Sequence, residues 1–206
     1  MNYLYGLVIF IRNSIGIIHN PYSTYRKIAT SKNLILNQIF GLYLLVVAYF
    51  LLTSLVRIGL KNPYLLTVKF NLLTIGSASG FLLMIFLFYV LGKLWQVPSF
   101  KLDRVIVLWT YSLWPTLLWF TVTALLYRLV PPPRTWTLSG GSLSIVFITY
   151  SLTLLFWKLI LFYLTLRFAL KLDLFKIIFS FFLIVPPVAI YSFIFYKLGI
   201  FRIPFI

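Results

Sequence analysis

The amino-acid sequence predicts an all-α integral membrane protein, a bundle of five transmembrane helices with an amphipathic helix at the membrane interface before them. Of the 206 residues, 62% are hydrophobic and only 10% are charged. A soluble domain carries about 25% charged residues to cover its surface. The apolar residues also form continuous runs of about 20 residues, the length that a helix needs to cross a bilayer. Strands of a membrane barrel would alternate instead.

The N-terminal segment, residues 1–33, is predicted to be the interfacial amphipathic helix followed by a basic stretch. Its apolar run is short, because Arg12, Asn13 and Ser14 interrupt it and Pro21 ends it. A sixth span would place these residues near the bilayer centre, where an arginine costs at least ~2.5 kcal/mol. The interfacial position is therefore favoured.

Residues 34–206 are predicted to form one compact transmembrane domain. Turns rich in proline, glycine or asparagine separate its apolar runs, and no connection is long enough to hold a soluble domain. The five predicted spans run from Ile35 to Ile58, Phe70 to Leu94, Arg104 to Val130, Ser142 to Phe168 and Leu174 to Gly199.

The charge is strongly unbalanced, with 18 lysines and arginines against two acidic residues. The cations lie mostly at the ends of apolar runs, where they would face anionic lipid headgroups, so a lipid partner is favoured over nucleic acid. An N-terminus in the cytoplasm gives the inner side the larger share of cations. That side would hold Arg12, Arg26, Lys27, Lys32, Lys93, Lys101, Arg104, Arg167, Lys171 and Lys176. The outer side would hold Arg57, Lys61, Lys69, Arg128, Arg134, Lys197 and Arg202.

Catalytic chemistry is hard to build from this composition. The chain has no cysteine, no glutamate, one histidine and two aspartates. These cannot readily form a structural zinc site or a pair of catalytic carboxylates. We therefore expect no catalytic residues, no metal and no cofactor, and a protein that is not an enzyme.

Gly76 and Gly80 in the second span have the spacing that lets two membrane helices approach closely. The residues between them are small as well. The pair would serve either the packing of this chain's own helices or the docking of a partner, including a second copy. Internal packing is favoured, because a five-span bundle offers ample surface for it.

Four charged residues are candidates for a polar or lipid-binding site. Asp103 and Asp173 begin the third and fifth spans, where a negative charge stabilises a helix N-terminus by ~0.3–1 kcal/mol. With Arg104 they could also form a polar site on the inner face. Lys158 is the only lysine, arginine or acidic residue that lies inside a span rather than at one of its ends. It would either extend its ammonium group toward the interface or point into the bundle and bind a lipid headgroup or a backbone carbonyl.

Prolines are predicted to kink two of the spans. Pro115 lies in the third span, and Pro186 and Pro187 lie in the fifth. Each proline leaves a backbone carbonyl without its usual donor, so these sites should face protein or a wet cavity.

Three segments together resemble the Yip proteins, membrane proteins named for their interaction with Ypt/Rab GTPases. The first is NPYSTYRK (20–27), a basic amphipathic entry before the first span. The second is SFKLDRVIVLWTYSLWP (99–115), with its Tyr-Ser and proline. The third is FWKLILFYLTLRFALKLDLFKIIF (156–179), which covers the fourth span, a tight loop and the start of the fifth.

The resemblance implies a five-span bundle with a cytosolic N-terminus, no catalytic activity and a role in membrane trafficking or organisation. Eukaryotic members carry a long cytosolic N-terminal region that these residues do not include, so the short prokaryotic relatives and a plasma membrane are the closer expectation. The favoured function is association with membrane proteins, with itself or with lipids, as a scaffold or accessory subunit. The alternatives are a permease subunit that works with a separate ATPase, or an accessory subunit of a large membrane complex.

Overall fold

The computed structural model describes residues 2–31, 37–41, 43–44, 46–48, 63–98, 100–129 and 138–197. All regular secondary structure in this part of the chain is helical, and four helical stretches are long and apolar enough to cross a membrane. They agree with the second to fifth predicted spans. The first predicted span, Ile35 to Ile58, falls mostly outside the described residues, so the count of five spans stays a prediction.

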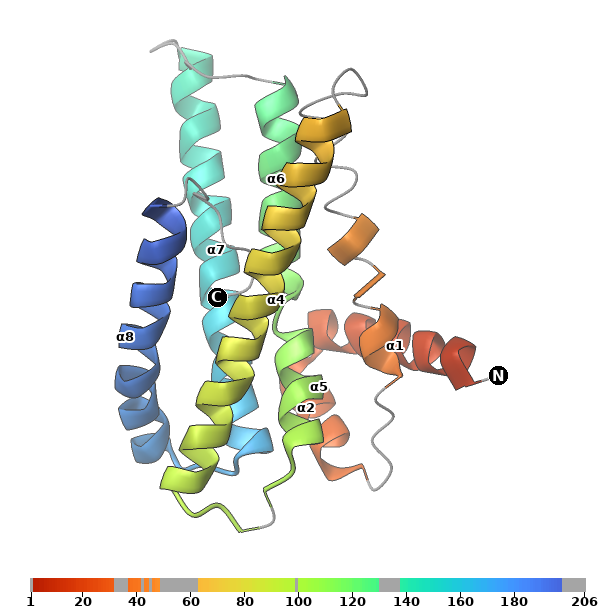
Figure 1. Cartoon of the computed structure of the whole chain (residues 1–206), viewed down its shortest axis with the longest axis vertical. Coiled ribbons are helices and arrows are strands. Elements are labelled where there is room, and N and C mark those ends of the chain that lie inside the picture. The colour runs from red at the N-terminus through yellow and green to blue at the C-terminus, as the bar shows by residue number, and fades with distance from the viewer. Residues whose placement is uncertain are drawn as a thin grey trace.

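The spanning stretches run along the long axis of the molecule (Figure 1). One of them consists of two helices, since the third predicted span is interrupted. The helices are α4 (Pro63–Leu94), α5 (Leu102–Tyr111), α6 (Trp114–Leu129), α7 (Leu138–Ala169) and α8 (Leu174–Lys197). The spanning stretches are Thr74–Leu94, Leu102–Thr123, Gly141–Ala169 and Leu174–Lys197.

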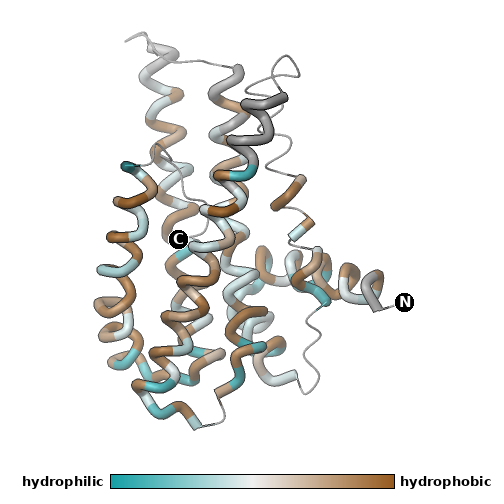
Figure 2. The backbone as a smooth tube through the Cα atoms, in the orientation of Figure 1, coloured by the Kyte–Doolittle hydropathy of each residue, from teal (hydrophilic) through white to brown (hydrophobic). Residues whose placement is uncertain are grey.

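The core is built around α5, which α2, α4 and α7 surround. The indole of Trp109 is almost wholly buried and meets the ring of Phe88 edge to face, with 5.2 Å between the ring centroids. In contrast, only 17% of the α8 span is buried inside the molecule. Hydrophobic residues recur along the long helices (Figure 2), and many of their large apolar side chains are exposed. Such a surface requires lipid or other protein around it.

Two short helices precede the bundle, α1 (Asn2–His19) and α2 (Pro21–Thr30). Asn20 caps α2, because its side-chain oxygen accepts a 3.3 Å bond from the backbone N–H of Ser23, and Pro21 takes the first helical position. α1 lies across the direction of the long helices (Figure 1). The predicted N-terminal helix is therefore present, and α2 packs on α5 and α7 of the bundle.

The orientation of α1 differs from that of a simple amphipathic helix. Ser14 is buried and half-buried Asn13 bonds to the bundle, although in the sequence these residues only interrupt an apolar run. They face the bundle because side chains there satisfy them. The exposed side of α1 is an apolar stripe instead, made of Leu4, Val8, Ile11, Ile15 and Ile18. The face of α1 toward the bundle combines Asn13 and Ser14 with the buried core residues Phe10 and Ile17, and its exposed side is mostly apolar.

Backbone hydrogen bonds end α4 in a tight turn. The N–H of Gln96 donates to the carbonyl of Lys93, and the N–H of Val97 donates to that of Gly92. This paired closure requires a left-handed residue, and Gln96 takes that conformation with φ of 45°. The ring of Phe100 then folds back to 2.7 Å from where a side chain on Gly92 would begin. After this turn the chain enters α5 at Leu102.

Candidate functional site

The break between α5 and α6 is the centre of the candidate site. α5 ends at Tyr111, and the first bond of α6 runs from the N–H of Leu117 to the carbonyl of Leu113. Pro115 is the second residue of α6 and has no N–H to offer to the last turn of α5. The expected kink at Pro115 therefore takes the form of a two-residue interruption. The carbonyl of Ser112 lies inside it, outside the ladder of α6.

Lys158 of α7 reaches into this break. Its Nζ donates a 3.0 Å hydrogen bond to the carbonyl of Ser112 and lies 4.4 Å from the ring centroid of Trp109. Of the two positions expected for Lys158, the structure shows the one inside the bundle. The C-terminal end of a helix carries partial negative charge, which favours a cation there. The ammonium group thus supplies a donor at the buried C-terminal end of α5.

No side-chain carboxylate accompanies Lys158. The chain contains only two acidic residues. Asp103 lies in the first turn of α5, at the opposite end of that helix, and Asp173 pairs with Arg167. The positive charge of Lys158 is met by a carbonyl dipole and an aromatic face instead.

A second polar cluster joins α1 to the same break. The hydroxyl of Tyr111 donates to Oε1 of Gln38 at 2.8 Å, and Nδ2 of Asn13 donates to the same oxygen at 3.1 Å. Gln38 and Tyr111 are both buried. Next to this cluster, Nε1 of Trp114 donates to Oγ of Ser14 at 3.1 Å. Three segments distant in the sequence therefore meet in this cluster through side-chain hydrogen bonds.

Sequence reasoning missed this cluster. In the sequence, Asn13 and Ser14 interrupt an apolar run, and Gln38 is a polar residue near the start of a predicted span. The only available signal was that three amide or hydroxyl side chains occur within apolar segments, where each requires a partner. The sequence does not say which partners these are.

Tyr25 fastens α2 to α5. Its side chain is completely buried, and its hydroxyl donates to the carbonyl of Leu108 at 3.1 Å. Burial raises the pKa of the Tyr25 hydroxyl above its ordinary value, so the group stays a neutral donor. The carbonyls of Leu108 and Ser112 are thus both held by side chains from other helices.

The glycines of α4 lie against α8. A side chain on Gly76 would begin 3.0 Å from the ring of Phe195, and the hydroxyl of Tyr191 donates to the carbonyl of Gly76. Ser79 lies 2.7 Å from the same hydroxyl. Gly80, one turn further, is also buried. For Gly76 this close approach takes place within the chain, which is the first of the two alternatives predicted.

Cations gather where α4 and α7 end and α5 and α8 begin, beside α2, at the lower end of the molecule in Figure 1. Arg167 pairs with Asp173 at 3.4 Å, but both side chains are exposed, and it also donates to the carbonyl of Leu172 at 2.9 Å. Nε of Arg104 is buried without a partner. We call this region the basic end; it comprises Arg26, Lys27, Lys93, Lys101, Arg104, Arg167, Lys171 and Lys176.

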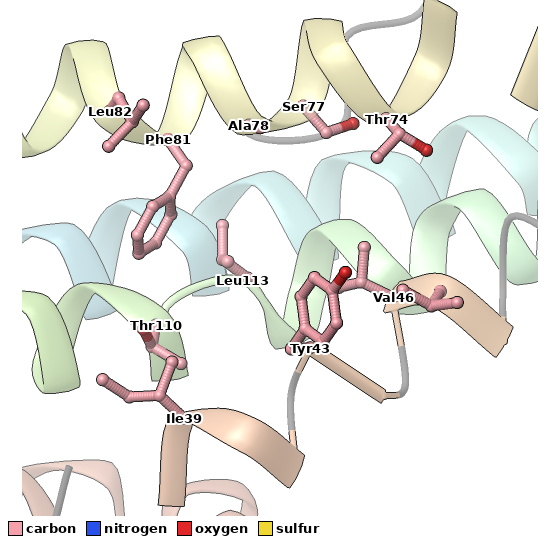
Figure 3. Close-up of a pocket in the computed structure, with 11 residues that line it drawn as sticks. Ile39, Tyr43, Val46, Thr74, Ser77, Ala78, Phe81, Leu82, Thr110 and Leu113 are labelled. Atoms are coloured by element: carbon pink, nitrogen blue, oxygen red, sulfur yellow. The ribbon is translucent and has the colours of Figure 1, made fainter. Parts of the chain in front are cut away.

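A cavity of about 290 Å³ lies beside the break, between α4 and the helical residues of Gln38–Ala48 (Figure 3). Thr110 and Leu113 form its wall on the side of the break, and the side chains of Phe81 and Ile39 flank them. The exposed lining is almost entirely apolar. The cavity is suited to hydrocarbon and offers water few partners.

Among the described residues, no three His, Asp or Glu side chains come together in a way that could hold a metal ion. No protein-family model matches the chain, and neither curated proteins nor solved structures show significant similarity to it. The resemblance to the Yip proteins therefore remains a hypothesis that rests on three sequence segments.

Proposed function

We propose that this multi-pass membrane protein works by association, binding anionic lipids and a membrane partner as a scaffold or accessory subunit. The observation that carries the proposal is the basic end. Its eight cations are accompanied by Asp103 and Asp173 alone, and the only described ion pair is exposed. Anionic headgroups attract each nearby lysine or arginine by about 1 kcal/mol.

The position of α1 supports the same proposal. Its apolar stripe faces outward, while Asn13 and Ser14 are fixed to the break by hydrogen bonds. A helix anchored in this way can lie in the membrane surface with its outer stripe among the lipid chains. Under this proposal the basic end and the N-terminus face the cytoplasm, as the excess of cations there favours. We extend the proposal to a prokaryotic plasma membrane.

The permease alternative rests on Lys158, a cation within a spanning stretch. Its ammonium group is already bound to the carbonyl of Ser112, and the neighbouring cavity is apolar. Both features suit a closed packing contact better than a polar path for a solute. Association is therefore the better supported of the two functions.

The test is to extract the protein gently from native membranes by a C-terminal tag and to identify bound proteins and lipids by mass spectrometry. The test variant changes Lys27, Lys101 and Lys171 to glutamine. A matched control changes Lys61, Lys69 and Lys197, which the sequence places toward the other side. We expect the first variant alone to lose anionic lipid. Extraction without enriched anionic lipid and without a stoichiometric partner would overturn the proposal.

A further inference from the structure

The two adjacent prolines of α8 leave backbone groups without donors. Pro186 and Pro187 lie inside the helix, which continues through both of them. Neither residue has an N–H, so the carbonyls of Phe182 and Leu183, four residues earlier, lose their usual donors. Water is absent from the hydrocarbon core, where an unpaired backbone group costs several kcal/mol.

One face of this part of α8 is exposed in the part of the chain that the structure describes. The side chains of Phe182 and Leu183 are 68% and 42% exposed, and Pro186 is exposed as well. The buried residues of the helix, Ser180 and Ile184, occupy its other side. No side-chain donor in the described part of the chain reaches either carbonyl.

The other proline site shows how this protein treats the same problem when the site is internal. Pro115 is buried, and Lys158 from a neighbouring helix donates to the carbonyl of Ser112 within the break. At α8 the side chains around the two carbonyls are largely exposed, and none of the helices that the structure describes supplies a side-chain donor. The contrast indicates that the donor for α8 comes from outside the chain.

We propose that the outward face of α8 around Pro186 and Pro187 is the docking surface for a transmembrane helix of a partner protein. The partner helix would present a hydroxyl or amide donor. Ala189 is exposed beside the prolines, and small residues let two helix backbones approach closely. This inference rests on the proposed function and locates the partner that it requires.

The hydroxyl groups that α7 exposes at Thr149 and Thr153 do not favour a second copy as this partner. The exposed threonines on the outer side of α7 already donate to their own helix. Thr149 donates to the carbonyl of Ile145 at 3.0 Å, and Thr153 donates to that of Thr149 at 2.9 Å. These two hydroxyl groups would have to leave their own helix to serve α8 of another copy.

The experiment uses defined helices as probes. The full-length protein is placed in phosphatidylcholine vesicles with a labelled leucine-rich transmembrane peptide that carries one central asparagine, or with the same peptide without it. Binding is measured by energy transfer. We expect the asparagine peptide to bind about threefold to tenfold more tightly, as interhelical hydrogen bonds in membranes allow. Equal binding of the two peptides would overturn the proposal.

Two variants separate docking from folding. Replacing Pro186 and Pro187 by alanine supplies the missing N–H groups, so preferential binding should disappear while thermal stability is maintained or raised. Phe175→Ala removes an exposed ring at the start of α8 and should leave the preference unchanged. Binding that persists in the double alanine variant would contradict the assignment.

The outcome also separates this inference from the proposed function. Loss of lipid retention in the variant of the basic end does not depend on α8, so either result can fail alone. If the wild-type protein forms a dimer that the double alanine variant abolishes, the partner is a second copy and our assignment of a different protein is wrong.

Discussion

The Nζ atom of Lys158 donates to the carbonyl oxygen of Ser112 at 3.0 Å and thereby closes the gap between α5 and α6. A charged side chain within a span usually indicates a functional site. Here its geometry also gives it a structural task, because the carbonyl has no place in the ladder of α6.

Replacing Lys158 by methionine should destabilise the protein by about 1–2 kcal/mol, because the carbonyl of Ser112 loses its donor. In a Pro115→Ala background the cost should be smaller, since residue 115 then has an N–H and the two helices can join. The measurement is a double-mutant cycle from unfolding in detergent. If the changes in unfolding free energy caused by Lys158→Met and Pro115→Ala are strictly additive, Lys158 does not act through the break.

Removing the amide of Gln38 should release α1 from the bundle. Gln38→Leu leaves the hydroxyl of Tyr111 and the amide of Asn13 without their shared acceptor, at a cost of about 1–3 kcal/mol. We expect faster labelling of a cysteine placed at Ile17, which is completely buried on the same helix and lies outside the polar cluster. Gln38→Glu, which keeps the acceptor, is the control and should protect this position better than leucine does.

Bulk at Gly76 should push α4 and α8 apart. A leucine there would meet the ring of Phe195, whereas nothing lies within 4 Å of a side chain started on Gly141. Gly76→Leu should lower the thermal stability of the purified protein, and Gly141→Leu should not. Energy transfer between labels on α4 and α8 would report the separation directly; an unchanged signal in Gly76→Leu would argue against this contact.

Gln96→Gly should stabilise the protein by about 0.4–1 kcal/mol, because glycine adopts the left-handed conformation at the end of α4 without steric cost. Gln96→Val should act in the opposite direction, since a β-branched residue is strained at positive φ. Thermal unfolding of the three proteins in one detergent decides this. A loss of stability in the glycine variant would mean that the side chain of Gln96 has another role.

The two contacts of Arg167 should differ in their contribution. Asp173→Asn removes only an exposed ion pair and should change stability by less than about 1 kcal/mol. Arg167→Met also removes the donor to the carbonyl of Leu172 and should cost more. Raised salt concentration should have little effect on the difference between the two variants, because it is the bond to the carbonyl that distinguishes them.

The sequence by itself determined the class of the protein and the positions of the second to fifth spans. Membrane helices follow from local properties, a long apolar run bounded by cations and turn residues, and no contact is needed to recognise them. The sequence also indicated Pro115 as a point where the third span departs from a regular helix, because the lack of an N–H is a property of that residue alone.

Only the tertiary structure decided which polar groups meet. Lys158 could equally have extended toward the interface, and Asn13 could have faced water, since each choice is open to a side chain considered alone. The choice depends on Ser112 and Gln38 arriving from other helices. In a dry interior a polar group bonds to the partner that packing brings within reach. The residues next to it in the sequence do not identify that partner.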